Sequence, residues 1–283
     1  MRYTIYIICI VMMINQKSFS QWEPIQDFHA NCNNAVLSND SMIWGIGNLG
    51  QVFKHDIYYQ EFEYYQFNDN LEFHCIDILN DSVMFLGGRY GQNIDGFLLS
   101  YRYDIDSIVT IDIKPYIIWD VKFVSQDTGF YSCFNGIHRT TNGGTSWNTV
   151  WKVDSIGAEF GDIYSITIDS TSGIYASGEK RQSQVGSSFQ GFVIKSEDCG
   201  STWELVFENP FGNIWGLNYN LGQVFCHDRN RTTIYMSPDS GTSWSTLNIP
   251  VTDPTLITSD VILLSQDNII ACVAPGIGPL TED

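Results

Sequence analysis

The sequence predicts an all-β fold, a β-propeller of four-stranded antiparallel blades, and three observations support this expectation. Strand-like runs of roughly four to seven residues fill most of the chain, and Gly, Asn, Asp and Ser separate them. The chain is rich in residues that strands favour, with 15 Tyr and 17 Phe, and no long segment places its apolar residues at helical spacing. One octapeptide recurs three times, beginning at residues 140, 196 and 237, so the copies lie 56 and 41 residues apart. Four strands and their turns need about that length.

The octapeptide has the pattern Ser/Thr-x-Asp/Asn-x-Gly-x-Ser/Thr-Trp. A short acidic or amide side chain at the third position can accept hydrogen bonds from nearby backbone N–H groups and fix a turn. The glycine allows a positive φ, and the tryptophan brings a large apolar surface to the start of the next strand. We therefore predict three structural hairpin turns. Their pattern residues are Thr140, Asn142, Gly144 and Trp147; Ser196, Asp198, Gly200 and Trp203; and Ser237, Asp239, Gly241 and Trp244.

This pattern resembles the Asp-box of the BNR repeats found in sialidases, sortilin-type receptors, some glucanases and the photosystem II assembly-factor-like propellers. The segment Trp119–Val150 closely resembles the last group, through Val121-Lys-Phe123, Gly129-Phe130, Gly136-Ile-His-Arg-Thr140 and Gly143-Gly144. The resemblance to that group covers roughly Trp119–Trp244 and implies architecture rather than function, because in the Asp-box family the box lies on the outer rim of a blade, away from the active face. It implies no photosynthetic role.

The repeat divides the chain into six visible blades. Five of them are Asn33–Phe67, His74–Ile113, Trp119–Val150, Ile163–Phe207 and Ile214–Ile249, and a sixth begins at Thr255. The sixth blade lacks its last strand, and two explanations stay open. The N-terminal strand around Trp22 can complete it and close the ring, or the chain is part of a longer propeller with a seventh blade. We favour the longer protein, because the chain stops at Thr281–Asp283, where another turn motif would begin.

The first 20 residues predict a secretory signal peptide. Arg2 is the charged start, Tyr3–Ile14 is apolar but too short to span a bilayer, and Ser18-Phe19-Ser20 fits a cleavage site. We expect residues 21–283 to form one propeller domain, secreted or at the cell surface, monomeric and without a membrane span. The net charge of −18 argues against nucleic acid and anionic membranes and is compatible with neutral or cationic ligands.

The cysteines predict no metal site and no cofactor. They form no CxxC pair and no Cys/His metal spacing. In the expected second strands, one aligned position carries small residues throughout, which suits close packing between blades. We expect its thiols to be buried and free, and Cys199, which lies in a turn, to be exposed. The aligned residues are Gly45, Gly87, Cys133, Ser177, Cys226 and Cys272.

Two sets of residues are candidates for ligand binding. Trp119, Tyr164 and Trp215 begin the first strands of three blades, where they can stack on a sugar or a peptide side chain or simply pack between blades. Loops after the second strands hold a large share of the scarce arginines, which indicates an acidic or planar ligand or, alternatively, a solvated rim. The loop candidates are Arg89, Glu179, Arg181, Asp228 and Arg229.

The sequence favours a binding protein over an enzyme. We expect a non-catalytic propeller that binds a protein or a glycan through its loop face, with no catalytic residues. The alternative is a sialidase-like or glucanase-like glycoside hydrolase with its active site at the channel mouth. The resemblance weakens that alternative, since the Arg-Ile-Pro tripeptide of sialidases is absent. No carboxylate pair stands out among the 32 acidic residues either, and HExxH and GxSxG motifs are absent.

Overall fold

The computed structural model describes residues 32–38, 42–56, 59, 61–181, 189–210, 212–220, 222–228, 233–248, 256–265 and 268–275, without the side chains of residues 32, 37, 62 and 256–275. Several predicted features lie outside the described residues: the signal at 1–20, the segment around Trp22, Arg229 and the C-terminal Thr281–Asp283. The side chains of Cys32 and Cys272 lie outside them as well.

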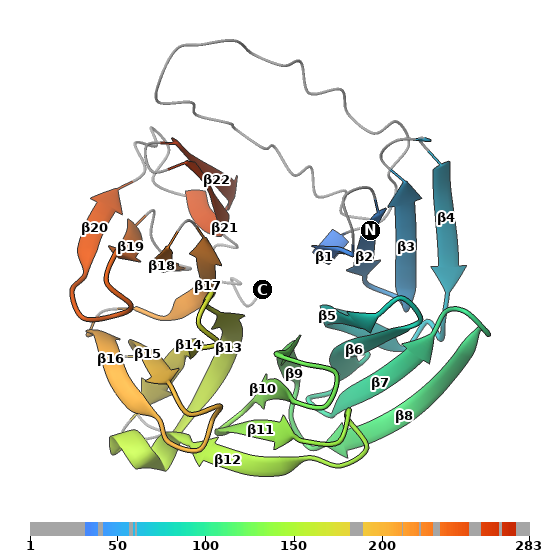
Figure 1. The fold of residues 1–283 in the computed structure, drawn as a ribbon, viewed down its shortest axis with the longest axis horizontal. Helices are drawn as coiled ribbons and strands as arrows, with labels where there is room; N and C mark the ends of the chain where they lie inside the picture. The colour runs from blue at the N-terminus through green and yellow to red at the C-terminus, as the bar shows by residue number, and fades with distance from the viewer. Residues whose placement is uncertain are drawn as a thin grey trace, which may run out of the picture. The chain divides into compact units, whose positions relative to one another are not determined.

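The described residues form β-strands and one turn of 3-10 helix (Figure 1). The first sheet contains β1 (Cys32–Leu37), β2 (Met42–Gly47), β3 (Gln51–Asp56) and β4 (Glu61–Gln66). The second contains β5 (Leu71–Asn80), β6 (Val83–Tyr90), β7 (Gly96–Arg102) and β8 (Ser107–Lys114). The third contains β9 (Ile118–Phe123), β10 (Gly129–Cys133), β11 (Gly136–Thr140) and β12 (Asn148–Lys152), and η1 (Val153–Ile156) follows it.

The remaining strands form three more sheets. The fourth sheet contains β13 (Phe160–Ile168), β14 (Ile174–Arg181), β15 (Gln190–Ser196) and β16 (Glu204–Asn209). The fifth contains β17 (Ile214–Asn220), β18 (Gln223–Asp228), β19 (Thr233–Ser237) and β20 (Ser245–Asn248). The sixth contains β21 (Leu256–Ser265) and β22 (Asn268–Pro275). Within every sheet, strands adjacent in the chain pair antiparallel.

The all-β class and the four-stranded antiparallel blades are confirmed, and each of the first five sheets matches a predicted blade to within a few residues. The expectation of six or seven such blades is wrong: the described residues form five, and the sixth sheet has two strands. The predicted closure of the last blade by an N-terminal strand falls on residues outside the described part of the chain.

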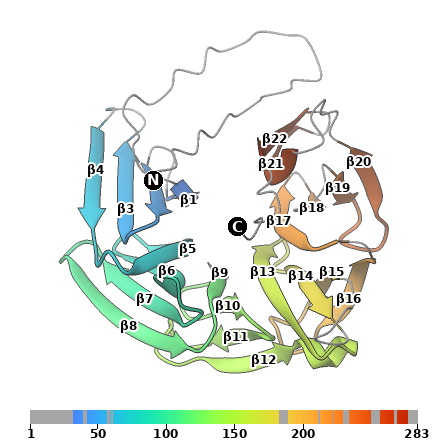
Figure 2. The ribbon, with the colours of Figure 1, turned by 180° about the vertical axis from the view of Figure 1, so that it is seen from behind.

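The strands separate into two compact units, one with β1–β12 and the other with β13–β22. In the first unit β5 contacts β1 and β9, and in the second unit β17 contacts β13 and β21 (Figures 1 and 2). The first strands of neighbouring sheets therefore face one another within each unit. Apolar cores lie between these sheets, one around Phe73, Leu86 and Phe97, and another around Tyr175, Val193 and Ile214.

The three octapeptides form the turns between the third and fourth strands of their sheets. In each, the Ser/Thr hydroxyl accepts the glycine N–H and donates to the Asn/Asp oxygen, which also accepts a backbone N–H further along. In the third turn, Gly241 N–H lies 2.7 Å from Ser237 Oγ, and Ser243 N–H lies 2.8 Å from Asp239 Oδ1. Gly241 has a φ of 92°. Hydrogen bonds from Thr202 hold the pKa of Asp198 down, at about 2.

Two of these turns also join neighbouring sheets within a unit. Trp244 Nε1 donates to Gly241 O in its own turn and to Val206 O in β16, both at 3.0 Å. The ring of Trp244 lies 4.8 Å from that of Phe207, centroid to centroid. In the other unit, Trp147 packs into the core formed by the second and third sheets, near Phe85 and Tyr131.

Every sheet carries a β-bulge in its first strand. At the bulge, pairing advances by two residues along the first strand and by one residue along the second strand, so the first strand has one extra residue there. In the fourth sheet, Ile163 pairs with Gly178 and Ser165 pairs with Ser177, so Tyr164 is the extra residue. The first such residue in each sheet is Asn33, His74, Trp119, Tyr164, Trp215 or Ser259, in sheet order, and the second and sixth sheets have a further shift at Leu79 and Leu264.

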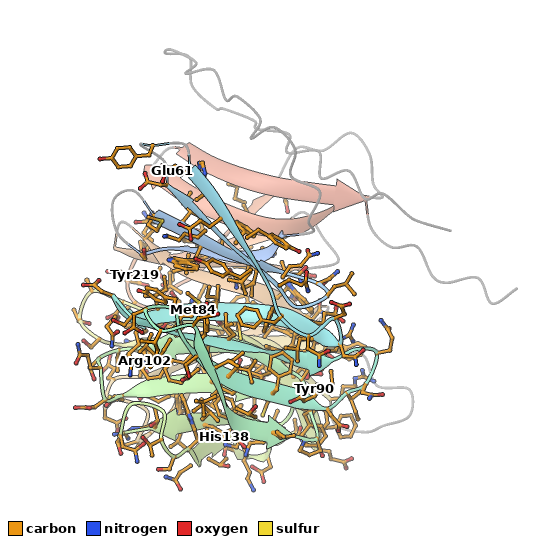
Figure 3. All side chains as sticks on the ribbon, turned by 90° about the vertical axis from the view of Figure 1, so that its right-hand side faces the viewer. Glu61, Met84, Tyr90, Arg102, His138 and Tyr219 are labelled. Atoms are coloured by element: carbon orange, nitrogen blue, oxygen red, sulfur yellow. The ribbon has the colours of Figure 1, made fainter. Side chains whose placement is uncertain are left out.

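In the three sheets that carry an octapeptide turn, the bulge lies toward the sheet end opposite that turn. In the fourth sheet, Ser196 begins the turn and pairs with Ile174 at the start of β14, whereas the bulge lies beside Gly178 near the end of β14. Figure 3 shows both ends of the second sheet: Tyr90 marks the end near the bulge at His74, and Arg102 marks the other.

The thiols of Cys75, Cys133 and Cys226 are buried and form no disulfide within the described residues, and burial raises the pKa of Cys75 and Cys226. The expected alignment of the small residues, however, is wrong by one position. Gly87 and Ser177 each pair with the first residue after the bulge in the first strand of their sheet. Cys133 pairs instead with the residue just before the bulge, and Cys226 pairs with the second residue after it. Cys199 is half-buried rather than exposed, and its φ is 57°.

Replacing Gly178 is expected to destabilise the fourth sheet. A Cβ at Gly178 would lie 2.0 Å from Asp162 O, because Gly178 sits against the bulged strand. We expect Gly178→Ala to lower the free energy of unfolding by about 1–3 kcal/mol, measured by urea denaturation. Gly136→Ala is the control, since its nearest neighbour would lie at 3.1 Å. Equal midpoints for Gly178→Ala and the native chain would contradict this interpretation.

Candidate functional site

The bulged residues of neighbouring sheets meet in pairs. The rings of Tyr164 and Trp215 lie 4.3 Å apart at a tilt of 35°. In the other unit, the rings of His74 and Trp119 lie 5.1 Å apart, edge to face. All four side chains are half-buried. A bulge redirects a side chain out of the regular alternation of a strand. Both aromatic pairs lie on strands of the sheets, which hold side chains more rigidly than loops do.

Glu179 lies beside the Tyr164–Trp215 pair. It is on β14, 6% exposed, and its Oε2 accepts a hydrogen bond from Asn213 Nδ2 at 3.1 Å. Burial is the main cause that raises the pKa of Glu179, and the charge of Asp162, opposite on β13, raises it further. Hydrogen bonds from Asn213 and Tyr164 oppose this shift.

Arg181 completes this group. Its Nη2 lies 3.8 Å from Glu179 Oε1, and its guanidinium carbon lies 3.3 Å from the centroid of the Phe189 ring. The guanidinium is therefore held between a carboxylate and an aromatic face. We call the set of Asp162, Tyr164, Glu179 and Trp215 the aromatic–carboxylate cluster, with Asn213 and Arg181 as its neighbours.

The first unit has a related group around its own aromatic pair. Arg89 forms a bidentate ion pair with Glu72, with Nε–Oε2 at 2.8 Å and Nη2–Oε1 at 3.0 Å. His74 Nε2 lies 3.8 Å from Glu72 Oε1, and its pKa is lowered to about 4, chiefly by burial. We call Glu72, His74, Arg89 and Trp119 the histidine–tryptophan cluster.

The structure thus brings together four of the predicted residues, Tyr164, Glu179, Arg181 and Trp215, in one unit, and connects Trp119 with Arg89 through Glu72 and His74 in the other. Of the predicted arginines, Arg89 and Arg181 each contact an acidic side chain of this chain.

Asp228 differs from the expectation of a loop residue. It is fully buried, accepts a hydrogen bond from Asn209 Nδ2 at 3.2 Å, and packs against Gly212. Arg229 lies outside the described residues.

Sequence reasoning missed His74, Asp162 and Asn213. His74 occupies the same bulge position as the predicted aromatic residues, so alignment of all the first strands would have found it. Asp162 and Asn213 both lie two residues before a bulge, a signal that appears only once the strand register is known.

Among the described residues, no group of three or more His, Cys, Asp or Glu side chains is placed to hold a metal ion. The part of the chain that the structure describes contains no helix with the length and apolarity needed to cross a membrane.

No protein-family model matches this sequence, and no curated protein matches it. Solved structures do match. The structure "YCF48 bound to D1 peptide" is 15% identical with a TM-score of 0.59, over 88% of this chain and 79% of that one. An oligogalacturonate lyase in complex with manganese is 9% identical with a TM-score of 0.58, over 89% and 78%. An ancestral GH74 enzyme is 13% identical with a TM-score of 0.56, over 81% and 33%.

These three structures are β-propellers, and at such low identities the likeness shows the fold alone. The chain is therefore a β-propeller. Its neighbours include enzymes as well as a protein bound to a peptide, so the likeness does not choose between catalysis and binding.

Proposed function

We propose that this protein is a non-catalytic β-propeller that binds a protein or glycan ligand at the aromatic–carboxylate cluster. The main observation that supports this proposal is the Tyr164–Trp215 pair, two half-buried rings 4.3 Å apart on the bulged first strands of neighbouring sheets. Aromatic faces that are held rigidly suit both sugar rings and peptide side chains. The peptide in "YCF48 bound to D1 peptide" is consistent with such a role for this fold.

The proposal includes a structural role for the three octapeptide turns, as Asp-boxes of the BNR type. Their hydrogen bonds are internal or link neighbouring sheets, and they lie at the sheet end opposite the bulges. It also includes export through the signal at 1–20 and a monomeric mature chain. N-terminal sequencing of the secreted protein should begin at Gln21, and light scattering should give the mass of one chain.

Trp215→Ala is expected to weaken ligand binding by at least about tenfold, because the few residues that dominate an interface are often tryptophans near its centre. Ligands would be found on peptide and glycan arrays and measured by titration. Tyr64→Ala is the matched control, since it removes an aromatic ring that is 47% exposed and distant in sequence from the cluster. Unchanged binding by Trp215→Ala, or an equal loss in Tyr64→Ala, would contradict the proposal.

A glycoside hydrolase is the second candidate, favoured by Glu179. Its raised pKa and the facing carboxyl of Asp162 are properties of an acid and its partner in glycoside hydrolysis. A hydrolase would release the aryl group from aryl glycosides and lose turnover in Glu179→Gln, whereas a binding protein would show no turnover in either form.

A further inference from the structure

The two units contain clusters built on the same register positions. In the second sheet, Glu72 lies two residues before the bulge at His74, and Arg89 pairs with Glu72 on the adjacent strand. In the fourth sheet, Asp162 lies two residues before the bulge at Tyr164, and its partner is Glu179. In both, the bulged residue of the next sheet completes the group: Trp119 in one and Trp215 in the other.

These equivalent positions differ in charge. In the histidine–tryptophan cluster the facing pair is a carboxylate and a guanidinium, joined by two hydrogen bonds. In the aromatic–carboxylate cluster the facing pair is two carboxyl groups, Asp162 and Glu179. A protein guanidinium thus occupies the first cluster at the position where the second has another acid.

Arg181 does not reproduce that guanidinium. It lies two residues further along β14 than Glu179, contacts Glu179 at 3.8 Å, and stacks on Phe189. By comparison, Arg89 meets Glu72 at 2.8 Å with both oxygens engaged. The titratable groups that act on Glu179 are Asp162, Tyr164 and Arg181, so two acids and two aromatic rings face one cation.

We propose that the aromatic–carboxylate cluster binds a cationic group, the ammonium or guanidinium of a lysine or arginine side chain in a peptide ligand. The carboxyls of Asp162 and Glu179 would hold the cation where Arg89 lies in the equivalent cluster, and the rings of Tyr164 and Trp215 would contact its stem and face. This inference rests on the proposed binding function and names its ligand class.

Two further observations agree with a cation. Burial and the neighbouring Asp162 disfavour the charged form of Glu179, and a bound cation would relieve both effects. The chain carries a net charge of −18, which attracts cationic peptides and speeds their association.

The test uses N-acetylated pentapeptide amides Gly-Gly-X-Gly-Gly with Lys, Arg or the neutral norleucine at X. Each is titrated into the whole secreted chain at low salt, to millimolar concentration, and followed by the NMR signal of the Trp215 indole, assigned through Trp215→Phe. We expect the Lys and Arg peptides to bind at least about tenfold more tightly than the norleucine peptide. Glu179→Gln and Asp162→Asn should each weaken Lys-peptide binding by about tenfold.

Two further variants sharpen this test. Glu179→Arg would place a guanidinium opposite Asp162, as in the other cluster, and should abolish Lys-peptide binding. Glu204→Gln removes one exposed acid of the same unit and should leave binding unchanged, which separates a local site from net charge.

Equal binding of Lys and norleucine peptides, binding of neither, or an equal loss in Glu204→Gln would overturn the cationic ligand. If a glycan or neutral peptide still shifts the Trp215 signal, the proposed binding function survives that result. If no array ligand depends on Trp215, both fail.

Discussion

Trp244→Ala is expected to lower the free energy of unfolding by about 2–4 kcal/mol, somewhat less than the cost of truncating a fully buried aromatic residue, because Trp244 is partly buried. The ring of Trp244 packs against Val206 and Phe207 of the neighbouring sheet. Its Nε1–H joins its own turn, at Gly241 O, to β16, at Val206 O. The substitution therefore removes both an apolar contact and a hydrogen bond between two sheets. Urea denaturation followed by circular dichroism would measure the change.

Trp244→Phe is the control that separates these two contributions. It keeps most of the apolar contact with Phe207 but loses the N–H donor, so we expect a smaller loss of about 1–3 kcal/mol. If Trp244→Ala and the native chain had the same denaturation midpoint, the contacts of Trp244 with the neighbouring sheet would contribute nothing measurable to the free energy of unfolding. If both variants lost the same amount, the ring would contribute little beyond its hydrogen bonds.

The octapeptide turns could be predicted because their information is local. Ser237, Asp239 and Gly241 lie within five residues of one another, and the hydrogen bonds among them follow from side-chain chemistry and the φ that glycine permits. The spacing of the turns then gave the boundaries of the five four-stranded sheets. Continuing the repeat past the third turn predicted the two strands that form β21 and β22, but the count of six blades was wrong, because the described residues add no further strand to that sheet.

The candidate site could be predicted only in part. The alignment of first strands found Trp119, Tyr164 and Trp215, because they share a position relative to their blades. The bulge at that position is a difference in register between two strands, and neither strand alone reveals it. Because the sequence does not show the bulges, the predicted alignment placed Cys133, Ser177 and Cys226 at one position, whereas the structure places Cys133 and Cys226 one residue away from the position of Ser177.

The burial of individual charged residues could not be predicted from the sequence either. Glu179 and Asp228 both lie within the last three residues of a second strand, and the sequence alone predicted loop positions for both. The structure buries both, and it places Glu179 beside two aromatic rings while Asp228 packs against Gly212. What separates them is which neighbouring sheet each one meets, and this depends on tertiary packing.

Acidification is expected to destabilise the protein through His227. This side chain is 1% exposed, packs over Gly216, and its Nε2 has no hydrogen-bond partner among the described residues. Burial lowers its pKa to about 4, below the value of 6.5 expected in the unfolded chain. Between these two values the unfolded chain binds the proton more readily, so stability is complete above about pH 6.5 and falls as the pH approaches 4. The difference of about 2.5 pKa units corresponds to about 3 kcal/mol.

His227→Phe isolates this contribution, because the variant keeps a ring of similar size and cannot bind the proton. Urea denaturation at pH 7.0 and at pH 4.5 gives the loss of stability for each protein, and we expect that loss to be about 2–3 kcal/mol smaller in His227→Phe. Taking the difference between two pH values within one protein cancels any change in packing that the substitution causes. His74 and His138 also have pKa values lowered to about 4, so a smaller dependence on pH should remain in the variant. An identical loss in both proteins would show that His227 gains a proton in the folded chain as readily as in the unfolded chain, and its burial would then carry no pH dependence.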